Sequence, residues 1–393
     1  MIRRGAVLLL LMLLLSSAAC AERDTPVETD DISQRERTQE AIDGVFSGLD
    51  FSELGNVTLS LPGYDRALSV EETARALASG ETFSVDALLA QVFGAFFNAL
   101  KEMGKLMLSL MLPVLLAGLL AHLDTGDGHL SPLVHSVCLV IILVPVVLVV
   151  LGELGHARET ITSMTSRMGK LLPLLLTLLT AVGGNASSAF LHPVVMAASG
   201  SMVFLAREVI LRLVMCTCAV TAVNHLSDRA HLTRLAELLR SAVCWLLGVS
   251  FTVFLGAMSL QGVVSASVDG VAIRAAKYAV DNFVPVVGGM FSDTMDTLVG
   301  CTLIVKNALG VTSAFALAAA LITPLMRTLA VVFVFKLSAA LLEPVADAQI
   351  VGAIGDFSRT LVLFLITMLC VGTMYFLLIV QLLLVGNLTV MLR

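Results

Sequence analysis

The stretch LVHSVCLVIILVPVVLVVL, Leu133–Leu151, contains no Asp, Glu, Lys or Arg and decides the class of fold. About 20 apolar residues form a helix long enough to cross the hydrocarbon core of a bilayer. The whole chain of 393 residues agrees, because 58% of it is hydrophobic and 14% charged, against about 45–50% and about 25% in soluble domains. The sequence therefore predicts an all-α, polytopic helical membrane protein.

Other apolar runs of similar length predict a transmembrane domain of about seven spans over residues 101–393. With the first stretch, the clearest candidates are Leu106–Leu123, Leu171–Phe190, Ala242–Leu260, Gly310–Met326, Thr328–Leu342 and Leu361–Gly386. Arg327 separates two of these runs, and Pro324 nearby indicates a tight helical hairpin there. The charged residues of 152–170 indicate a loop. Residues 193–223 contain three charges and could form one long tilted helix or two short ones.

The N-terminus is typical of an exported membrane protein. Residues 1–21 have a basic start, a short apolar run and an A-x-A-like site, which together predict a signal peptide. Cleavage after Ala21 is the first interpretation, and a lipoprotein box that ends in Cys20 is the second. Residues 22–100 are expected to form an acidic extracytoplasmic helical segment, since Glu22–Ala90 contains 15 acidic and 5 basic residues. This acidity argues against nucleic acid as a partner.

Within that segment the sequence predicts three helices. Ser33–Leu49 alternates charged and apolar residues as an amphipathic helix does. Ser69-Val-Glu-Glu72 matches a capping box that opens a short helix ending at Gly80. A third helix starts near Ser84 and is expected to lie on the membrane surface or on the bundle. The orientation stays open, because the signal peptide and the positively charged 152–170 segment place opposite loops in the cytoplasm.

A polar segment over residues 262–306 interrupts the apolar chain. Charged residues three or four positions apart share one face of a helix, and the proline and glycines between them break it into re-entrant or interfacial helices. The candidate pore-facing or partner-facing residues are Arg274, Lys277, Asp281, Pro285, Gly288, Asp293, Asp296 and Lys306. The alternative is a solvated amphipathic helix at the interface, with Lys306 reaching the headgroups as membrane-end lysines do.

Enzyme motifs are absent from the sequence. It contains no GxSxG, HExxH, P-loop or GxGxxG motif, its seven histidines are scattered, and no CxxC pair occurs. We therefore expect no enzyme, no catalytic residue, no metal and no cofactor. An intramembrane enzyme is the least favoured hypothesis, because no pair of candidate catalytic residues supports it.

The polar segment resembles one known family. RAAKYAVDNFVPVVGGMFSDTMDT at Arg274–Thr297, GCTLIVKNALGV at Gly300–Val311 and EPVAD at Glu343–Asp347 are similar to the stage III sporulation protein AE family. The similarity in layout extends over essentially the whole chain. The family has no established catalytic residues that could be assigned to positions of this chain. The functional roles of the eight candidates therefore rest on their charge and position.

The resemblance implies a non-enzymatic membrane component of a mother cell–forespore transenvelope channel, or secretion-like complex. The protein would lie in the mother-cell membrane around the forespore. It would be required for late forespore gene expression and for forespore integrity. The implied partners are the lipid bilayer, other membrane proteins of the same sporulation operon and, through the complex, a forespore membrane protein. A stand-alone secondary transporter of a small solute is the alternative. It should show an inverted repeat, yet residues 100–140 offer no counterpart of the polar segment.

Overall fold

The structure is a computed structural model of the chain. It describes residues 42–48, 58–59, 68–78, 90, 92–104, 108, 111–112, 131–226, 232–283, 288–344 and 348–391. Between residues 260 and 296 it describes the side chains of Val271, Arg274, Ala275 and Tyr278 only. The predicted signal peptide, most of the acidic segment and most of the predicted span Leu106–Leu123 lie outside the described residues.

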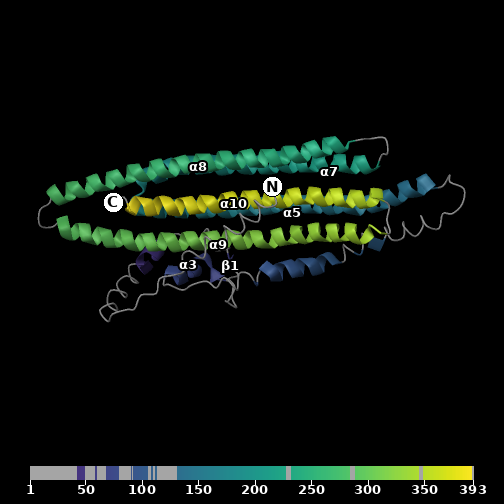
Figure 1. The fold of residues 1–393 in the computed structure, drawn as a ribbon. Helices are drawn as coiled ribbons and strands as arrows, with labels where there is room; N and C mark the ends of the chain where they lie inside the picture. Colours follow the sequence, from purple (N-terminus) through teal and green to yellow (C-terminus); the bar gives the residue numbers. More distant parts are fainter. Residues whose placement is uncertain are drawn as a thin grey trace.

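Long helices lie side by side in an elongated bundle (Figure 1). In chain order they are α5 (Ser131–Ala181), α6 (Asn185–Phe204), the π-helix η3 (Leu205–Ile210), α7 (Leu211–Leu226), α8 (Thr233–Phe283), α9 (Gly288–Leu342) and α10 (Ala348–Met391). The centre of the bundle is α10, which contacts α5, α7, α8 and α9. Phe357 and Phe364 of α10 are fully buried. The prediction of a helical, multi-pass membrane protein is therefore supported.

Four described helical segments are long and apolar enough to cross a membrane: Leu139–Ala181, Thr233–Ser259, Thr297–Leu342 and Ala348–Leu388. They are longer than single spans require, since 43 residues of α5 extend about 65 Å against a hydrocarbon core of about 30 Å.

Two expectations drawn from charge patterns are wrong. The expected loop at 152–170 lies inside the continuous helix α5, and the expected hairpin near Pro324 lies inside the continuous helix α9. Among the charged residues of 152–170, Arg158 and Glu159 are exposed, Arg167 and Lys170 are half-buried, and Glu153 is buried against a partner helix, so the helix accommodates all of them without ending. Pro324 is accommodated because neighbouring helices can satisfy the carbonyl that a proline leaves without a donor.

The ambiguous region 193–223 is one continuous helical rod. It passes from α6 into α7 through η3, which contains Arg207 and Glu208. A π-helix accommodates an extra residue without ending the helix, so of the two alternatives the single long helix is correct. Arg212 pairs with Glu208 one turn away.

The N-terminal elements cover one side of α9. Helix α3 (Val70–Ala78) contacts α9, and the predicted capping box opens it. The Ser69 amide donates to Glu72 Oε2 over 2.9 Å, and the Glu72 amide donates to Ser69 Oγ over 3.1 Å. Before it, β1 (Thr58–Leu59) pairs antiparallel with β2 (Leu68–Ser69). This short pairing is an exception to the all-α prediction.

Two further helical pieces belong to this covering layer. Residues 42–47 bury Phe46 beneath Arg75 of α3, whose guanidinium lies 5.1 Å from the ring centroid. Residues 92–104 form a helix in which Phe96 meets Phe333 of α9 with ring centroids 6.3 Å apart. The third predicted helix therefore packs on the bundle, which is one of the two expected placements.

Candidate functional site

The polar segment is distributed over two long helices. Arg274 is exposed on α8, which also contains Lys277 and Asp281, while α9 contains Gly288, Asp293 and Asp296. Helix α8 ends at Phe283 and α9 begins at Gly288, both at the same end of the bundle (Figure 1). Re-entrant or interfacial short helices are therefore not what the chain forms here. The side chains of these residues other than Arg274, and the whole of Pro285, lie outside the described part of the chain.

Of the two predicted residues whose side chains the structure describes, Arg274 is exposed and Lys306 lies in the interior. Its side chain is almost completely buried between α9 and α10, and Nζ donates to the Leu383 carbonyl over 3.0 Å. A Cβ at Gly386 would lie 1.9 Å from this Nζ, so the lysine occupies the space that the glycine leaves. The expectation that Lys306 reaches the headgroups is therefore wrong. Within the described residues its ammonium has no carboxylate partner.

Two asparagines adjoin the helix turns around Lys306. Oδ1 of Asn307 on α9 and Oδ1 of Asn387 on α10 are both buried and have no hydrogen-bond partner among the described residues. Buried polar atoms without partners are uncommon in native structures. This part of the α9–α10 contact is therefore polar and incompletely hydrogen-bonded at the end of the bundle where α8 meets α9.

A charged network lies near the other end of the bundle and joins α7, α8 and α10. Asp356 Oδ2 lies 3.0 Å from His225 Nε2, and Asp356 Oδ1 lies 3.4 Å from Arg240 Nη1. Arg240 also donates to the Asp356 carbonyl over 3.1 Å. The side chains of all three are at most 21% exposed. Because charges buried this far need partners, the network fixes these three helices relative to one another.

A second cluster joins α5 to α9. The Thr328 hydroxyl donates to Glu153 Oε2 over 2.6 Å, and Arg327 Nε lies 3.9 Å from Glu153 Oε1. The Glu153 side chain is 4% exposed, whereas that of Arg327 is 40% exposed. A buried carboxylate is thus held by one hydroxyl and by one cation that still reaches solvent.

A hollow of about 620 Å³ adjoins this cluster between the helix of residues 92–104 and α9. It is lined by Gly94, Ala95, Asn98, Ala99, Glu102, Thr323 and Arg327. Its polar groups include both signs of charge, so it could hold water or a small polar solute.

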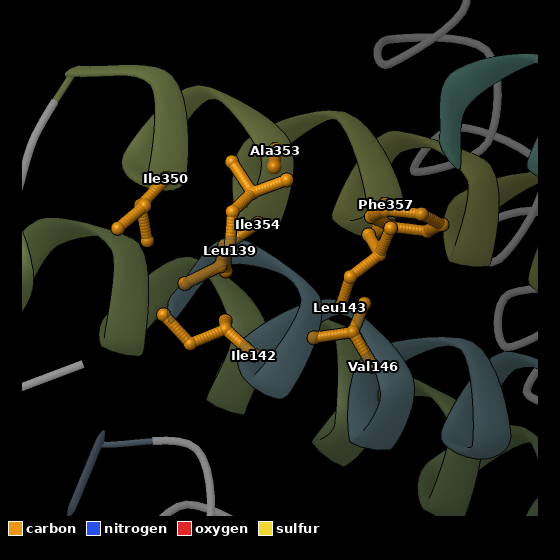
Figure 2. A pocket seen from close by; sticks show the side chains of 8 residues that line it. All are labelled: Leu139, Ile142, Leu143, Val146, Ile350, Ala353, Ile354 and Phe357. Carbon is orange, nitrogen blue, oxygen red and sulfur yellow. The ribbon is translucent and has the colours of Figure 1, made fainter. Parts of the chain in front are cut away.

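Figure 2 shows an apolar contact between the N-terminal parts of α5 and α10. All eight side chains around it are apolar, and the void among them is about 10 Å³. Such a space, without polar partners, does not hold an ordered water. It is packing and not a binding site.

Comparisons with known proteins identify the family. The family model of stage III sporulation protein AE matches residues 68–386. The chain is also 30% identical over 315 residues to "Stage III sporulation protein AE" of Bacillus subtilis (strain 168), covering 80% of this chain and 79% of the relative. The chain belongs to the stage III sporulation protein AE family. No solved structure matches it.

Membership in the stage III sporulation protein AE family supports a role in sporulation and bears out the resemblance seen in the sequence. The matched range contains Lys306, the Asp356 network and the Glu153 cluster. Sequence reasoning did not single out Glu153, His225 or Asp356. One signal was available, since Glu153 and Asp356 are acidic residues inside otherwise apolar runs, and such residues in membrane helices usually face a partner.

The contacts of the Glu153 cluster predict which of two substitutions, Arg327→Leu or Glu153→Gln, destabilises the protein more. Arg327→Leu leaves a carboxylate that is 4% exposed without its cation, so we expect it to lower the free energy of unfolding by about 2 kcal/mol. Glu153→Gln keeps an acceptor for Thr328 and leaves Arg327 partly in solvent, so we expect less than about 1 kcal/mol. Thermal unfolding of the purified proteins in detergent measures both. The prediction fails if Glu153→Gln is the more damaging change.

Proposed function

We propose that this chain is a non-enzymatic membrane component of a channel or secretion-like complex between the mother cell and the forespore. It would reside in the mother-cell membrane around the forespore, with other membrane proteins of the same operon and, through the complex, a forespore membrane protein as partners. The observation that carries this proposal is the family match over residues 68–386. The bundle is compatible with it, because its helices are long enough to extend beyond the bilayer and meet partners outside the lipid.

The buried charges support a structural role for the interior. Asp356 joins α7, α8 and α10, Glu153 joins α5 to α9, and Lys306 joins α9 to α10. These groups hold helices to one another, which suits a scaffold or channel wall. We propose that Arg274, Lys277, Asp281, Asp293 and Asp296, near the α8–α9 end, face the pore or a partner.

Deletion of the gene in its sporulating host tests the proposal. We expect small or collapsing forespores and loss of late forespore-specific transcription after engulfment, with vegetative growth unchanged. The measurements are forespore size by microscopy and a late forespore transcriptional reporter. Complementation with the intact gene should restore both, and normal spores in the deletion strain would contradict the proposed role.

The same strain tests the charged positions. Lys277→Ala, Asp281→Ala and the exchange of the two charges are each introduced into the complementing gene. Full function in all three would remove these positions from the proposed partner-facing surface. Restoration by the exchange, after loss in both single variants, would show that the two residues act as an ion pair.

A stand-alone secondary transporter is the second candidate. The hollow lined by Asn98, Glu102 and Arg327 favours it, because transporters bind polar solutes at charged sites among helices. Normal forespores in the deletion strain, together with a defect in uptake or export of a small solute, would place this function first.

A further inference from the structure

The positions of charges along the bundle show which level the lipid occupies. On α9, Lys306 and Arg327 enclose twenty residues without a charge, and the distance between them along the helix is about 32 Å. Residues 241–268 of α8 and 360–391 of α10 also lack charged residues. A hydrocarbon core is about 30 Å thick. We therefore assign the bilayer to the slab between the levels of Lys306 and Arg327.

Helix α5 passes through the same slab. At one boundary Glu153 accepts a hydrogen bond from Thr328, the neighbour of Arg327. At the other, Leu179 lies so close to Gly386 that a Cβ there would be 3.2 Å from its Cδ1, and Lys306 contacts the same glycine. The stretch of α5 between Glu153 and Leu179 therefore lies at this level, and the apolar run Leu133–Leu151 at the start of α5 extends beyond it.

The outward face of this stretch is unlike a lipid-facing surface. We call it the α5 polar face, and its exposed residues include Gly155, Arg158, Glu159, Thr162, Ser166 and Gly169. Leu151 is the last large apolar residue that α5 exposes. On α8, at the bilayer level, the exposed side chains include Trp245, Val249 and Val253, which suit contact with lipid. The bundle thus has an apolar side and a polar side at the same depth.

Lipid is a poor neighbour for the α5 polar face. Arg158 and Glu159 are exposed and form no ion pair within the described residues. Charged side chains at bilayer depth are rare and almost always face protein or water. Gly155, Glu159, Thr162, Ser166 and Gly169 are spaced by four and three residues in turn, which is the spacing of a helix–helix seam. Small residues at such positions let two membrane helices approach closely.

We propose that a second copy of this chain covers the α5 polar face, with the two α5 helices side by side and parallel. Two copies inserted in the same orientation are related by a two-fold axis along the bundle, and such an interface brings each surface against itself. The adjacent charges have opposite signs, so Arg158 of each copy can approach Glu159 of the other and offset the repulsion between the two Glu159 carboxylates that the seam brings together. This pairing goes beyond the proposed sporulation role and can be tested in cells that do not sporulate.

Cysteine cross-linking in native membranes tests the pairing. The full chain is expressed with its seven native cysteines replaced, and Thr162→Cys or Ser166→Cys is introduced. At a two-fold axis each cysteine meets its own counterpart, so mild oxidation should shift both variants from the monomer band to a dimer band of twice its mass. Val253→Cys, at the same depth on the lipid-facing side of α8, is the matched control and should remain monomeric.

A second variant separates pairing from folding. Gly155 and Gly169 are exposed and a Cβ at either meets no atom within 4 Å, so the side chain of Gly155→Leu or Gly169→Leu starts on the outer surface of the monomer. Either change should abolish the Ser166→Cys dimer without lowering the amount of protein in the membrane. Equal cross-linking at Val253→Cys would show random collision and overturn the pairing. A Ser166→Cys monomer that reacts with a water-soluble maleimide would show that water covers the face, and cross-links to another protein would show a different partner.

Discussion

Replacement of Asp356 by alanine is expected to lower the free energy of unfolding by about 3 kcal/mol, because it removes the carboxylate that holds three helices. Arg240 and His225 are 14% and 12% exposed, so neither can recover full hydration after the change. Among the described residues, Arg240 would keep its bonds to the carbonyl of residue 356, 3.1 Å away, and to Thr221. Thermal unfolding in detergent, followed by intrinsic fluorescence or light scattering, measures the loss.

The matched control is Arg359→Ala on the same helix. Arg359 also contacts Asp356 Oδ1, over 3.2 Å, but its side chain is 70% exposed, so we expect a loss below about 1 kcal/mol. In the double variant Asp356→Leu with Arg240→Leu, the loss should be smaller than the sum of the two single losses. Simple additivity would contradict a direct interaction between the two residues.

The second large effect is expected at Gly386. A Cβ there would lie 1.9 Å from Lys306 Nζ and 2.6 Å from its Cε, so Gly386→Ala forces the buried ammonium away from the Leu383 carbonyl. Moving the buried cation off the Leu383 carbonyl, its one acceptor among the described residues, and overfilling the contact should together cost about 2–4 kcal/mol. Ordinarily Gly→Ala inside a helix stabilises by about 0.5–1 kcal/mol, so the expected sign is reversed here. Thermal unfolding in detergent checks it.

Gly355→Ala on the same helix is the control, since a Cβ there meets no atom within 4 Å. It should leave stability unchanged or slightly raised. Lys306→Leu shortens the side chain that Gly386→Ala displaces, so the double variant should recover most of the loss. Failure of this rescue would mean that the damage comes from another contact, such as Leu179.

Local chemistry explains what the sequence predicted well. The membrane class follows from composition, and the Ser69–Glu72 capping box involves residues three positions apart. Both could therefore be predicted from the sequence without knowledge of distant contacts. The continuity of α5 and α9 was not predicted, because charges between apolar runs look the same in a loop and on one exposed face of a helix. Whether that face meets water, lipid or protein depends on contacts that a single sequence does not show.

The contacts of the candidate site were even harder to predict from the sequence than the course of the helices. The sequence singled out Lys306 by its charge, but its burial depends on the space left by Gly386, on another helix. Asp356 and Arg240 are 116 residues apart, and Glu153 and Thr328 are 175 residues apart. Pairs this distant cannot be assigned from spacing, even though each acidic residue stands out in its apolar surroundings.

The length of α9 has a mechanical consequence. Its 55 residues extend about 80 Å, and only about 30 Å of that can lie in the hydrocarbon core. The remainder acts as a lever arm, and a tilt of about 6° would move one end of such a rod by about 8 Å relative to the other. A partner bound at the end where α8 meets α9 would therefore be displaced by several ångströms when the bundle tilts by a few degrees. In the other direction, a force that such a partner applies at this end would produce a torque on the buried polar contacts.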